Sequence, residues 1–322
     1  MAGPVRLHEH EDFASVLTAA AAENDLPEVF VEKDYWITEI LRVTATRFPD
    51  RAVFKGGTSL SKGWGLLDRF SEDIDLFVDP AVEPALRGRA IDRTLRRLKQ
   101  DVEAVDGLEF VKADSRTIGG RGRIDTFRYR SRYPPIQGFP PTVRLEPGVQ
   151  SGRQPTEVRR ISSIVGDTLA AGGAIDQLDV SGLEPFSMTL LHFRRTFVEK
   201  LFAIHGKVER LKQEDKPLGR DVRHYADLYV LAGRPEVLDM LASPEYESIR
   251  RDYDEKSRAY FANSHRPPKD LRFASSDALF PPEDLRARIE PGYEEECRRL
   301  FFRPPPPFVE VLERFQGIRE LL

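Results

Sequence analysis

The sequence predicts a mixed α/β (α+β) fold followed by a mainly helical C-terminal lobe. Short apolar strands alternate with helical patterns in the first part of the chain, and sheet signals largely stop after about residue 184. The 322 residues suffice for two units with sizeable cores. We therefore expect a mixed-sheet domain with N-terminal helices at residues 1–183 and a helical domain at residues 184–322.

Two helices are expected to open the fold, at residues 11–23 and 31–48. In the second, Trp36, Ile40 and Val43 recur at i, i+4 and i+7, which places them on one face. That apolar face predicts packing against a sheet.

A strand, a glycine turn and a helix are expected next. AVFKGG at 52–57 is a short apolar strand that runs into paired glycines, and a helix is expected over 58–67. DIDLFV at 73–78 then alternates acidic and apolar residues. A strand there places Asp73 and Asp75 on the same face.

The remaining elements follow from the same periodicities. A helix is expected at 85–105, and strands are expected at 127–133 and 141–148. In the C-terminal lobe, SMTLLHFRRTFVEKLFAIHGKVERL (187–211) is predicted to be one long helix and DVRHYADLYVLAG (221–233) another.

Composition excludes several classes of protein. No run approaches the roughly 20 apolar residues of a membrane helix, and the N-terminus lacks the apolar segment of a signal peptide, so we expect a cytoplasmic protein without a membrane partner. The single cysteine, Cys297, excludes an internal disulfide. The histidines, including His8 and His10, are not spaced as zinc ligands, and His192 and His205 are expected to cap or pack helices.

Charge is unevenly distributed along the chain. The formal net charge is −4, but residues 111–160 contain eleven Lys/Arg and four Asp/Glu, a local net charge of +7. Two interpretations stay open from charge alone: a solvated strand-and-loop face, or a face that binds nucleic acid.

Asp73 and Asp75 are candidate metal ligands. Carboxylates at i and i+2 of a strand project the same way, about 6 to 7 Å apart. Between apolar residues such like charges repel unless cations neutralise them, and Mg²⁺ prefers carboxylate ligands. Glu146, just before an expected Pro-Gly turn, is the candidate third carboxylate. Three carboxylates suit two Mg²⁺ ions, one activating an attacking hydroxyl and one stabilising leaving pyrophosphate.

The glycine turn suits the triphosphate of a nucleoside triphosphate. Backbone amides and hydroxyls at a helix N-terminus bind phosphate, and nearby lysines add positive charge. The Walker pattern GxxxxGK[ST] is missing from the sequence, which argues against a P-loop nucleotidase. The expected nucleotide-binding residues are Lys55, Gly56, Gly57, Thr58, Ser59 and Lys62.

A GG[ST] turn, a helix and then DxD on a strand, in this order, resemble the DNA polymerase β nucleotidyltransferase superfamily. The segments EKDYWITEILR, FKGGTSLSKGWGLLDRFSEDIDL, RRTFVEKL and RHYADLY further resemble the AbiEii/AbiGii toxin family, which includes the MenT-type toxins. This resemblance extends from residue 31 to about residue 231.

The resemblance implies roles for individual residues. It supports nucleotide and metal roles for the glycine turn and the DxD carboxylates, and it implies a functional, triphosphate-facing lysine at Lys200, oriented by Glu199. A late essential aspartate matches Asp227, with Asp221 as a second candidate. The structural alternatives are an exposed helical Lys200–Glu199 pair and an ion pair of Asp227 with Arg223.

Ser71 is similar in position to a hydroxyl that is phosphorylated in some MenT-type toxins. A phosphate there would crowd the metal carboxylates with negative charge and silence the enzyme. The alternative is that Ser71 only fixes the turn before the strand.

The resemblance also implies a toxin of a toxin–antitoxin system, with a cognate antitoxin. Such a toxin would transfer a nucleotide from a nucleoside triphosphate to RNA, at the 3′ acceptor end of tRNA, and block translation. Arg128, Arg130 and Arg132 would then contact the RNA backbone, and Tyr129 and Tyr133 would stack on unpaired bases.

Two other functions fit the same residues. The acceptor can instead be a protein hydroxyl or a small molecule, with the fold and the metal chemistry unchanged. A noncatalytic binding module is a further alternative, although the intact set of Asp73, Asp75 and Lys200 argues against it.

Overall fold

The computed structural model describes residues 5–71, 73–134, 136 and 139–322 and divides into two compact units. Unit 1 comprises Met1–Gly63, Glu72–Val149 and Glu157–Leu190, and unit 2 comprises Trp64–Ser71, Gln150–Thr156 and Leu191–Leu322. The sequence predicted one boundary between residues 183 and 184, whereas these units interleave along the chain.

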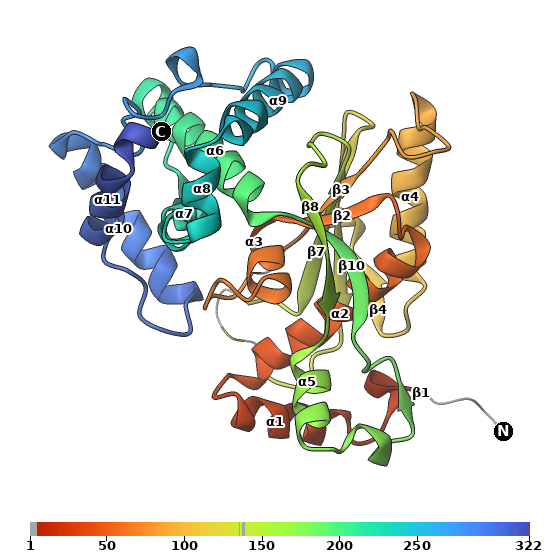
Figure 1. Cartoon of the computed structure of the whole chain (residues 1–322). Helices are drawn as coiled ribbons and strands as arrows, with labels where there is room; N and C mark the ends of the chain where they lie inside the picture. Colours follow the sequence, from red (N-terminus) through yellow and green to blue (C-terminus); the bar gives the residue numbers. More distant parts are fainter. Residues whose placement is uncertain (1–4, 72, 135, 137–138) are drawn as a thin grey trace. The chain divides into compact units, whose positions relative to one another are not determined.

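Unit 1 contains a mixed sheet (Figure 1). Its strand order is β4-β6-β7-β3-β2-β10-β8, with β5 paired to β6. Strand β3 lies inside the sheet, antiparallel to β2 and parallel to β7. A separate parallel pair joins β1 to β9. The bounds are β1 (Val5–Arg6), β2 (Ala52–Lys55), β3 (Asp73–Val78), β4 (Leu108–Phe110), β5 (Arg116–Ile118), β6 (Gly122–Tyr129), β7 (Thr142–Gly148), β8 (Thr156–Ile161), β9 (Val180–Ser181) and β10 (Phe186–Leu191).

Helix α2 packs against this sheet, as its apolar face predicted. Trp36 is buried and stacks on Tyr129 of β6, with ring centroids 5.6 Å apart. Helix α4 buries Leu95 against Val78 of β3 and Val149. The helices of unit 1 are α1 (Phe13–Glu23), α2 (Glu28–Arg47), α3 (Gly56–Thr58), α4 (Arg89–Glu103) and α5 (Ile164–Ala171).

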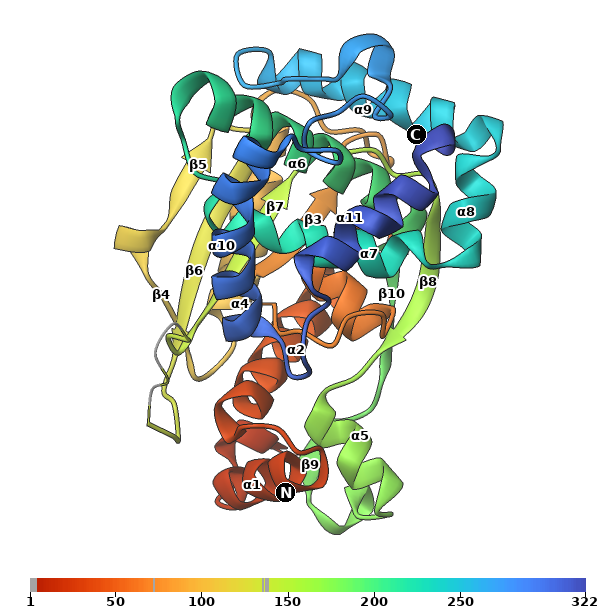
Figure 2. The ribbon, with the colours of Figure 1, turned by 90° about the vertical axis from the view of Figure 1, so that its left-hand side faces the viewer.

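Unit 2 is built around helix α6, which contacts α7, α8 and α9, and α7 in turn contacts α11 (Figure 2). Tyr225 of α7 lies edge-on against Phe308 of α11, with centroids 5.1 Å apart. None of the helices in the described ranges has the length and apolar character needed to cross a membrane. The bounds are α6 (Phe193–Glu214), α7 (His224–Ala232), α8 (Pro235–Leu241), α9 (Pro244–Phe261), α10 (Glu283–Leu300) and α11 (Phe308–Gly317).

The prediction of one helix over 187–211 was wrong at its start. Residues Phe186–Leu191 form strand β10, in which Leu190 pairs with Phe54 of β2. The apolar run before His192 fits a buried strand as well as a helix, and pairing with β2 decides between them. His192 then caps α6 by accepting a hydrogen bond from the Arg194 amide, as a capping role predicted.

Two smaller expectations also fail. The helix expected over 58–67 ends at Gly63, after α3 and a single π-helical turn, Ser59–Gly63. A Cβ at Gly63 would lie 2.2 Å from Leu190 Cδ2, so close packing against β10 requires this glycine. The expected Pro-Gly turn after Glu146 is instead strand, since Pro147 lies opposite Leu76 in the β3–β7 ladder.

Candidate active site

The acidic cluster of unit 1 forms where β3 and β7 run in parallel. Their register places Asp75 opposite Glu146 and Asp73 opposite Arg144. Asp73 and Asp75 are both half-buried, while Ile74 and Leu76 between and beyond them are buried, so the two aspartates share one face. The structure therefore brings together the three carboxylates that the sequence predicted.

Arg144 is a member of this cluster that the sequence analysis missed. It lies two residues before Glu146 on the same strand face, and its guanidinium binds the Glu146 carboxylate. Its Nε also lies 3.6 Å from Asp73 Oδ1. One arginine offsets part of the charge of three carboxylates and leaves the face acidic.

The electrostatics of Glu146 show how crowded the cluster is. Burial, together with the charges of Asp75 and Asp73, raises the pKa of Glu146 to about 7, against the opposing effects of Arg144 and Lys55. Such a cluster of hard oxygen donors favours a divalent cation, because the cation removes the repulsion that the fold imposes. The donor set fits Mg²⁺.

Gly56 makes the approach of the glycine turn to the cluster possible. Its φ is +75°, and a Cβ there would lie 2.0 Å from Asp75 Oδ2. The preceding residue, Lys55, lies opposite Asp75 in the antiparallel register of β2 and β3. The backbone of the turn thus lies directly against a metal-ligand candidate.

The other predicted nucleotide-binding side chains have structural partners in unit 1. Thr58 donates its hydroxyl hydrogen to the carbonyl oxygen of Asp73, and Ser59 donates to that of Phe54 at 3.4 Å. Lys62 Nζ donates to Asp34 Oδ1 at 2.6 Å and is largely buried. These contacts fix the turn against β3, β2 and α2, and a role of the three residues in binding phosphate stays a prediction.

Unit 2 contains a second cluster of ionised residues, and Asp227 is at its centre. Its side chain is fully buried and accepts hydrogen bonds from Arg69 Nε at 2.6 Å and Arg69 Nη2 at 2.8 Å. Lys200 Nζ lies 2.8 Å from the second carboxylate oxygen. Burial alone would raise the pKa of Asp227, but the charges of Arg69 and Lys200 hold it well below 3.8.

The exposed-pair alternative for Lys200 does not fit, and the alternative pairing of Asp227 with Arg223 stays a prediction. Lys200 is 5% exposed and so is not part of an exposed helical pair, and Asp227 pairs with Arg69 and Lys200. Burial lowers the pKa of Lys200. Burial and the Lys200 charge lower the pKa of His224 to about 4. The imidazole of His224 is therefore neutral near pH 7, and it lies 3.0 Å from Lys200 Nζ. Glu199, expected to orient the lysine, binds Ser151 and Arg195.

Asp221 lies in a different environment. It binds Lys207 at the partly exposed surface of unit 2. Burial alone would raise the pKa of Asp221, but His224 and Lys207 lower it. From the sequence, Asp227 and Asp221 are alternative matches to the late aspartate of the family. Of the two, Asp227 has the buried, multiply bonded carboxylate.

The structure exposes some, but not all, of the residues that were predicted to contact RNA. Arg128, Arg130 and Arg132 have exposed side chains at and beyond the end of β6. The expectation that Tyr129 stacks on bases was wrong, because this residue is buried against Trp36. Tyr133 donates its hydroxyl to the carbonyl of Ala14 and is held against α1.

Ser71, the predicted phosphorylation site, is buried in unit 2, with 6% of its surface exposed. A kinase would reach its hydroxyl only after the surrounding segment opens. Phosphorylation at this position therefore stays a prediction that also requires local opening.

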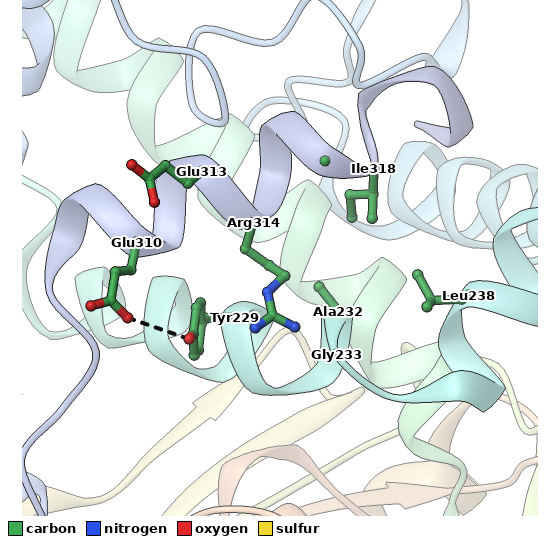
Figure 3. A pocket seen from close by; sticks show the side chains of 9 residues that line it. Tyr229, Ala232, Gly233, Leu238, Glu310, Glu313, Arg314 and Ile318 are labelled. Carbon is green, nitrogen blue, oxygen red and sulfur yellow. Dashed lines mark hydrogen bonds between the residues drawn. The ribbon is translucent and has the colours of Figure 1, made fainter.

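A hollow of about 680 Å³ lies between α7 and α11 of unit 2 (Figure 3). Arg314 reaches across it and lies 4.6 Å from the ring centroid of Tyr229. Its lining does not include Lys200 or Asp227. The hollow is therefore separate from the buried ion cluster of unit 2.

Comparison with known proteins agrees with the chemistry of the acidic cluster. A search of curated proteins found no match. The family model described as nucleotidyl transferase AbiEii toxin, type IV toxin–antitoxin system, matches residues 40–316. This description implies that members of the family use a nucleotide substrate and have an antitoxin partner. With the match covering most of its length, this chain belongs to the AbiEii nucleotidyltransferase toxin family.

Proposed function

We propose that this toxin transfers a nucleoside monophosphate from a nucleoside triphosphate to the 3′ acceptor end of tRNA, with Asp73, Asp75 and Glu146 as the ligands of Mg²⁺. The observation that supports this most directly is the juxtaposition of Asp75 with Glu146 on one side and with the Gly56 backbone on the other. Carboxylate donors and a close glycine turn on one strand face suit a metal-bound triphosphate.

The chemistry is an in-line displacement at the α-phosphorus. The acceptor hydroxyl loses its proton to solvent as its oxygen forms a bond to phosphorus, and the bond from phosphorus to the pyrophosphate oxygen breaks. Bound Mg²⁺ would activate the hydroxyl and stabilise the charge of the leaving pyrophosphate. The three carboxylates would hold the metal, Arg144 holds Glu146 in place, and Lys55 adds positive charge beside Asp75. Lys62 and the hydroxyls of Thr58 and Ser59 keep the turn rigid.

Lys200 and Asp227 are assigned to the reaction by their match to the family motifs. The rigid Arg69–Asp227–Lys200 cluster would hold the lysine ammonium in one position, which is what a phosphate-contacting cation needs.

The choice of RNA as acceptor rests on charge. Arg128, Arg130 and Arg132 extend as exposed cations from one end of β6, within a segment of net charge +7. Phosphate contacts by such arginines supply most of the affinity for nucleic acid. A protein hydroxyl or a small molecule as acceptor would not require them.

The test follows labelled nucleotide. Purified protein is incubated with total tRNA, Mg²⁺ and each labelled nucleoside triphosphate in turn, and products are separated on a denaturing gel. Asp73→Asn removes a ligand charge at constant size, and Glu109→Gln, on the exposed surface of β4, is the matched control. We expect label on tRNA with the native protein and the control but not with Asp73→Asn.

Other outcomes separate the alternatives. Asp73-dependent label on protein would replace RNA by a protein acceptor. Absence of transfer with every nucleotide would contradict the proposed reaction, and equal labelling by Asp73→Asn would contradict the assignment of the metal ligands.

A further inference from the structure

We propose that His8, Glu9 and Asp106 of unit 1 form a second metal site, for a divalent transition ion of the zinc class. One potential ligand atom from each residue lies within 4.8 Å of the other two. His8 and Glu9 precede the residues matched by the family model, which begin at residue 40. The site is separate from the carboxylates of β3 and β7.

The imidazole of His8 provides the strongest evidence. The residue is 7% exposed, and its Nε2 is buried without a hydrogen-bond partner among the residues that the structure describes. A buried ring nitrogen without a partner is destabilising, and such atoms are rare in folded proteins. This nitrogen faces Glu9, whose Oε1 lies 3.9 Å away, too far for a hydrogen bond. A cation between the two would satisfy both.

The other ring nitrogen is already fixed. His8 Nδ1 lies 2.8 Å from the hydroxyl oxygen of Tyr35, and Trp36 lies against the ring with centroids 4.8 Å apart. In the tautomer that binds a metal, Nδ1 donates to Tyr35 and Nε2 presents its lone pair. Metal-binding histidines are oriented in this way by a partner on the second nitrogen.

Both carboxylates are held near the His8 ring. Glu9 Oε2 accepts a hydrogen bond from the Arg6 amide at 3.0 Å, which leaves Oε1 directed toward His8. Asp106 lies on the turn before β4, where Gly107 has a φ of +81° and a Cβ would lie 2.6 Å from Trp36. The same tryptophan thus contacts the imidazole and the turn that supplies Asp106.

The donor set selects the class of metal. One imidazole nitrogen with carboxylate oxygens suits zinc and its neighbours, whereas Mg²⁺ favours oxygen donors alone. Bound metal would attach the N-terminal segment at β1 to the turn before β4. The spacing of histidines along the sequence did not predict zinc, because Asp106 is remote from His8 in the chain and joins it only in the folded unit.

The test is direct titration of Zn²⁺ into metal-free full-length protein by calorimetry, in excess Mg²⁺ so that the carboxylates of β3 and β7 are saturated. We expect one Zn²⁺ per chain and a rise in melting temperature. His8→Gln and Asp106→Asn should each lower the affinity about tenfold or more, and Tyr35→Phe, which removes the partner of Nδ1, about tenfold.

Matched variants control for surface binding and for misfolding. His10→Gln alters an adjacent histidine outside the group, and Asp73→Asn alters the other acidic cluster; both should bind Zn²⁺ like the native protein. Asp106 is exposed, so its variant tests the site even where His8→Gln does not fold. Native protein that binds no Zn²⁺, or Asp106→Asn that binds it as tightly as native protein, would overturn the proposal.

Discussion

Asp75 and Glu146 lie directly opposite each other in the parallel register of β3 and β7, with the Gly56 backbone against the same aspartate. Opposed carboxylates on neighbouring strands repel, so this arrangement costs stability in the metal-free protein. The cost is evidence of function, because sites that bind cations concentrate charges that the rest of the fold avoids.

The first prediction concerns pH and metal. The pKa of Glu146 is raised from 4.5 to about 7, so its carboxylate destabilises the metal-free folded state as pH rises. The protonated Glu146 carboxyl therefore adds about 3 kcal/mol to the free energy of unfolding, relative to the ionised form. This contribution is complete below pH 4.5 and is lost as pH rises through 7. Glu146→Gln should therefore unfold at higher temperature than the native protein at pH 8 without Mg²⁺, and this difference should vanish near pH 4.5.

Glu109→Gln is the control for this measurement, because Glu109 lies on the exposed surface of β4. It should leave the melting temperature nearly unchanged at both pH values. Adding Mg²⁺ at pH 8 should stabilise the native protein more than Glu146→Gln. A melting temperature for Glu146→Gln below that of the native protein at pH 8 would show that the carboxylate stabilises the metal-free fold.

The second prediction isolates the close approach of the glycine turn. Gly56→Ala places a methyl group against Asp75, in addition to the cost of a positive φ, about 1 to 2 kcal/mol. Gly120→Ala is the control that has only the free-energy cost of a positive φ. The φ of Gly120 is +68°, and a Cβ there meets no atom of the described structure within 4 Å. We expect nucleotide transfer to fall at least 100-fold in Gly56→Ala and less than about threefold in Gly120→Ala. Equal activities would exclude the contact as a requirement.

The third prediction separates Asp227 from Asp221. Asp227→Asn leaves Arg69 and Lys200 buried together without an anion, so the free energy of unfolding of unit 2 should fall by about 3 to 5 kcal/mol. Asp221→Asn breaks an ion pair with Lys207 that is about one-third exposed, and should cost less than about 1 kcal/mol. Urea denaturation followed by tryptophan fluorescence measures both.

Transfer activity of the same variants, assayed where both are folded, tests their roles in the reaction. We expect Asp221→Asn to stay active and Asp227→Asn to lose activity beyond its unfolded fraction. An Asp227→Asn protein as stable as the native one would contradict the buried ion cluster.

Local sequence patterns predicted the fold well where the pattern within one strand or helix is enough to show which of its residues are buried. Strand β3 has the predicted bounds, 73–78, because acidic and apolar residues alternate over 73–76 and the apolar residues continue to Val78. Residues 187–191 were mistaken for helix because their apolar run has no period that separates the two structures. Pairing of Leu190 with Phe54, distant in sequence, determines that they form a strand.

The site shows the same limit. Glu146 was identified from its strand, but Arg69, which binds Asp227 across 158 residues, has no signal in its own segment. The partner of Lys62, Asp34, was missed for the same reason, as was the proximity of Asp106 to His8. Such contacts arise only when the chain has folded, and a single sequence contains no measure of them.

The last prediction concerns the acceptor. Arg128 and Arg130 lie exposed at the end of β6, and Arg128 Nη1 lies 3.8 Å from the mostly exposed Glu109. The double variant Arg128→Glu, Arg130→Glu should weaken tRNA binding at least tenfold and lower the slope of log affinity against log salt by about 1.5, because about two phosphate contacts are lost. Nucleotide binding should change less than about twofold.

Filter binding across a salt series measures the affinity for tRNA, and calorimetry with a nonhydrolysable nucleoside triphosphate measures the affinity for the nucleotide. Arg96→Glu with Arg97→Glu makes the same charge change on the exposed surface of α4 and controls for net charge. Equal losses of RNA affinity in both double variants would show that the loss comes from the change in net charge and not from contacts of Arg128 and Arg130. Equal losses of RNA and nucleotide binding in Arg128→Glu, Arg130→Glu would instead place these arginines in nucleotide binding, and the acceptor would have to be recognised elsewhere.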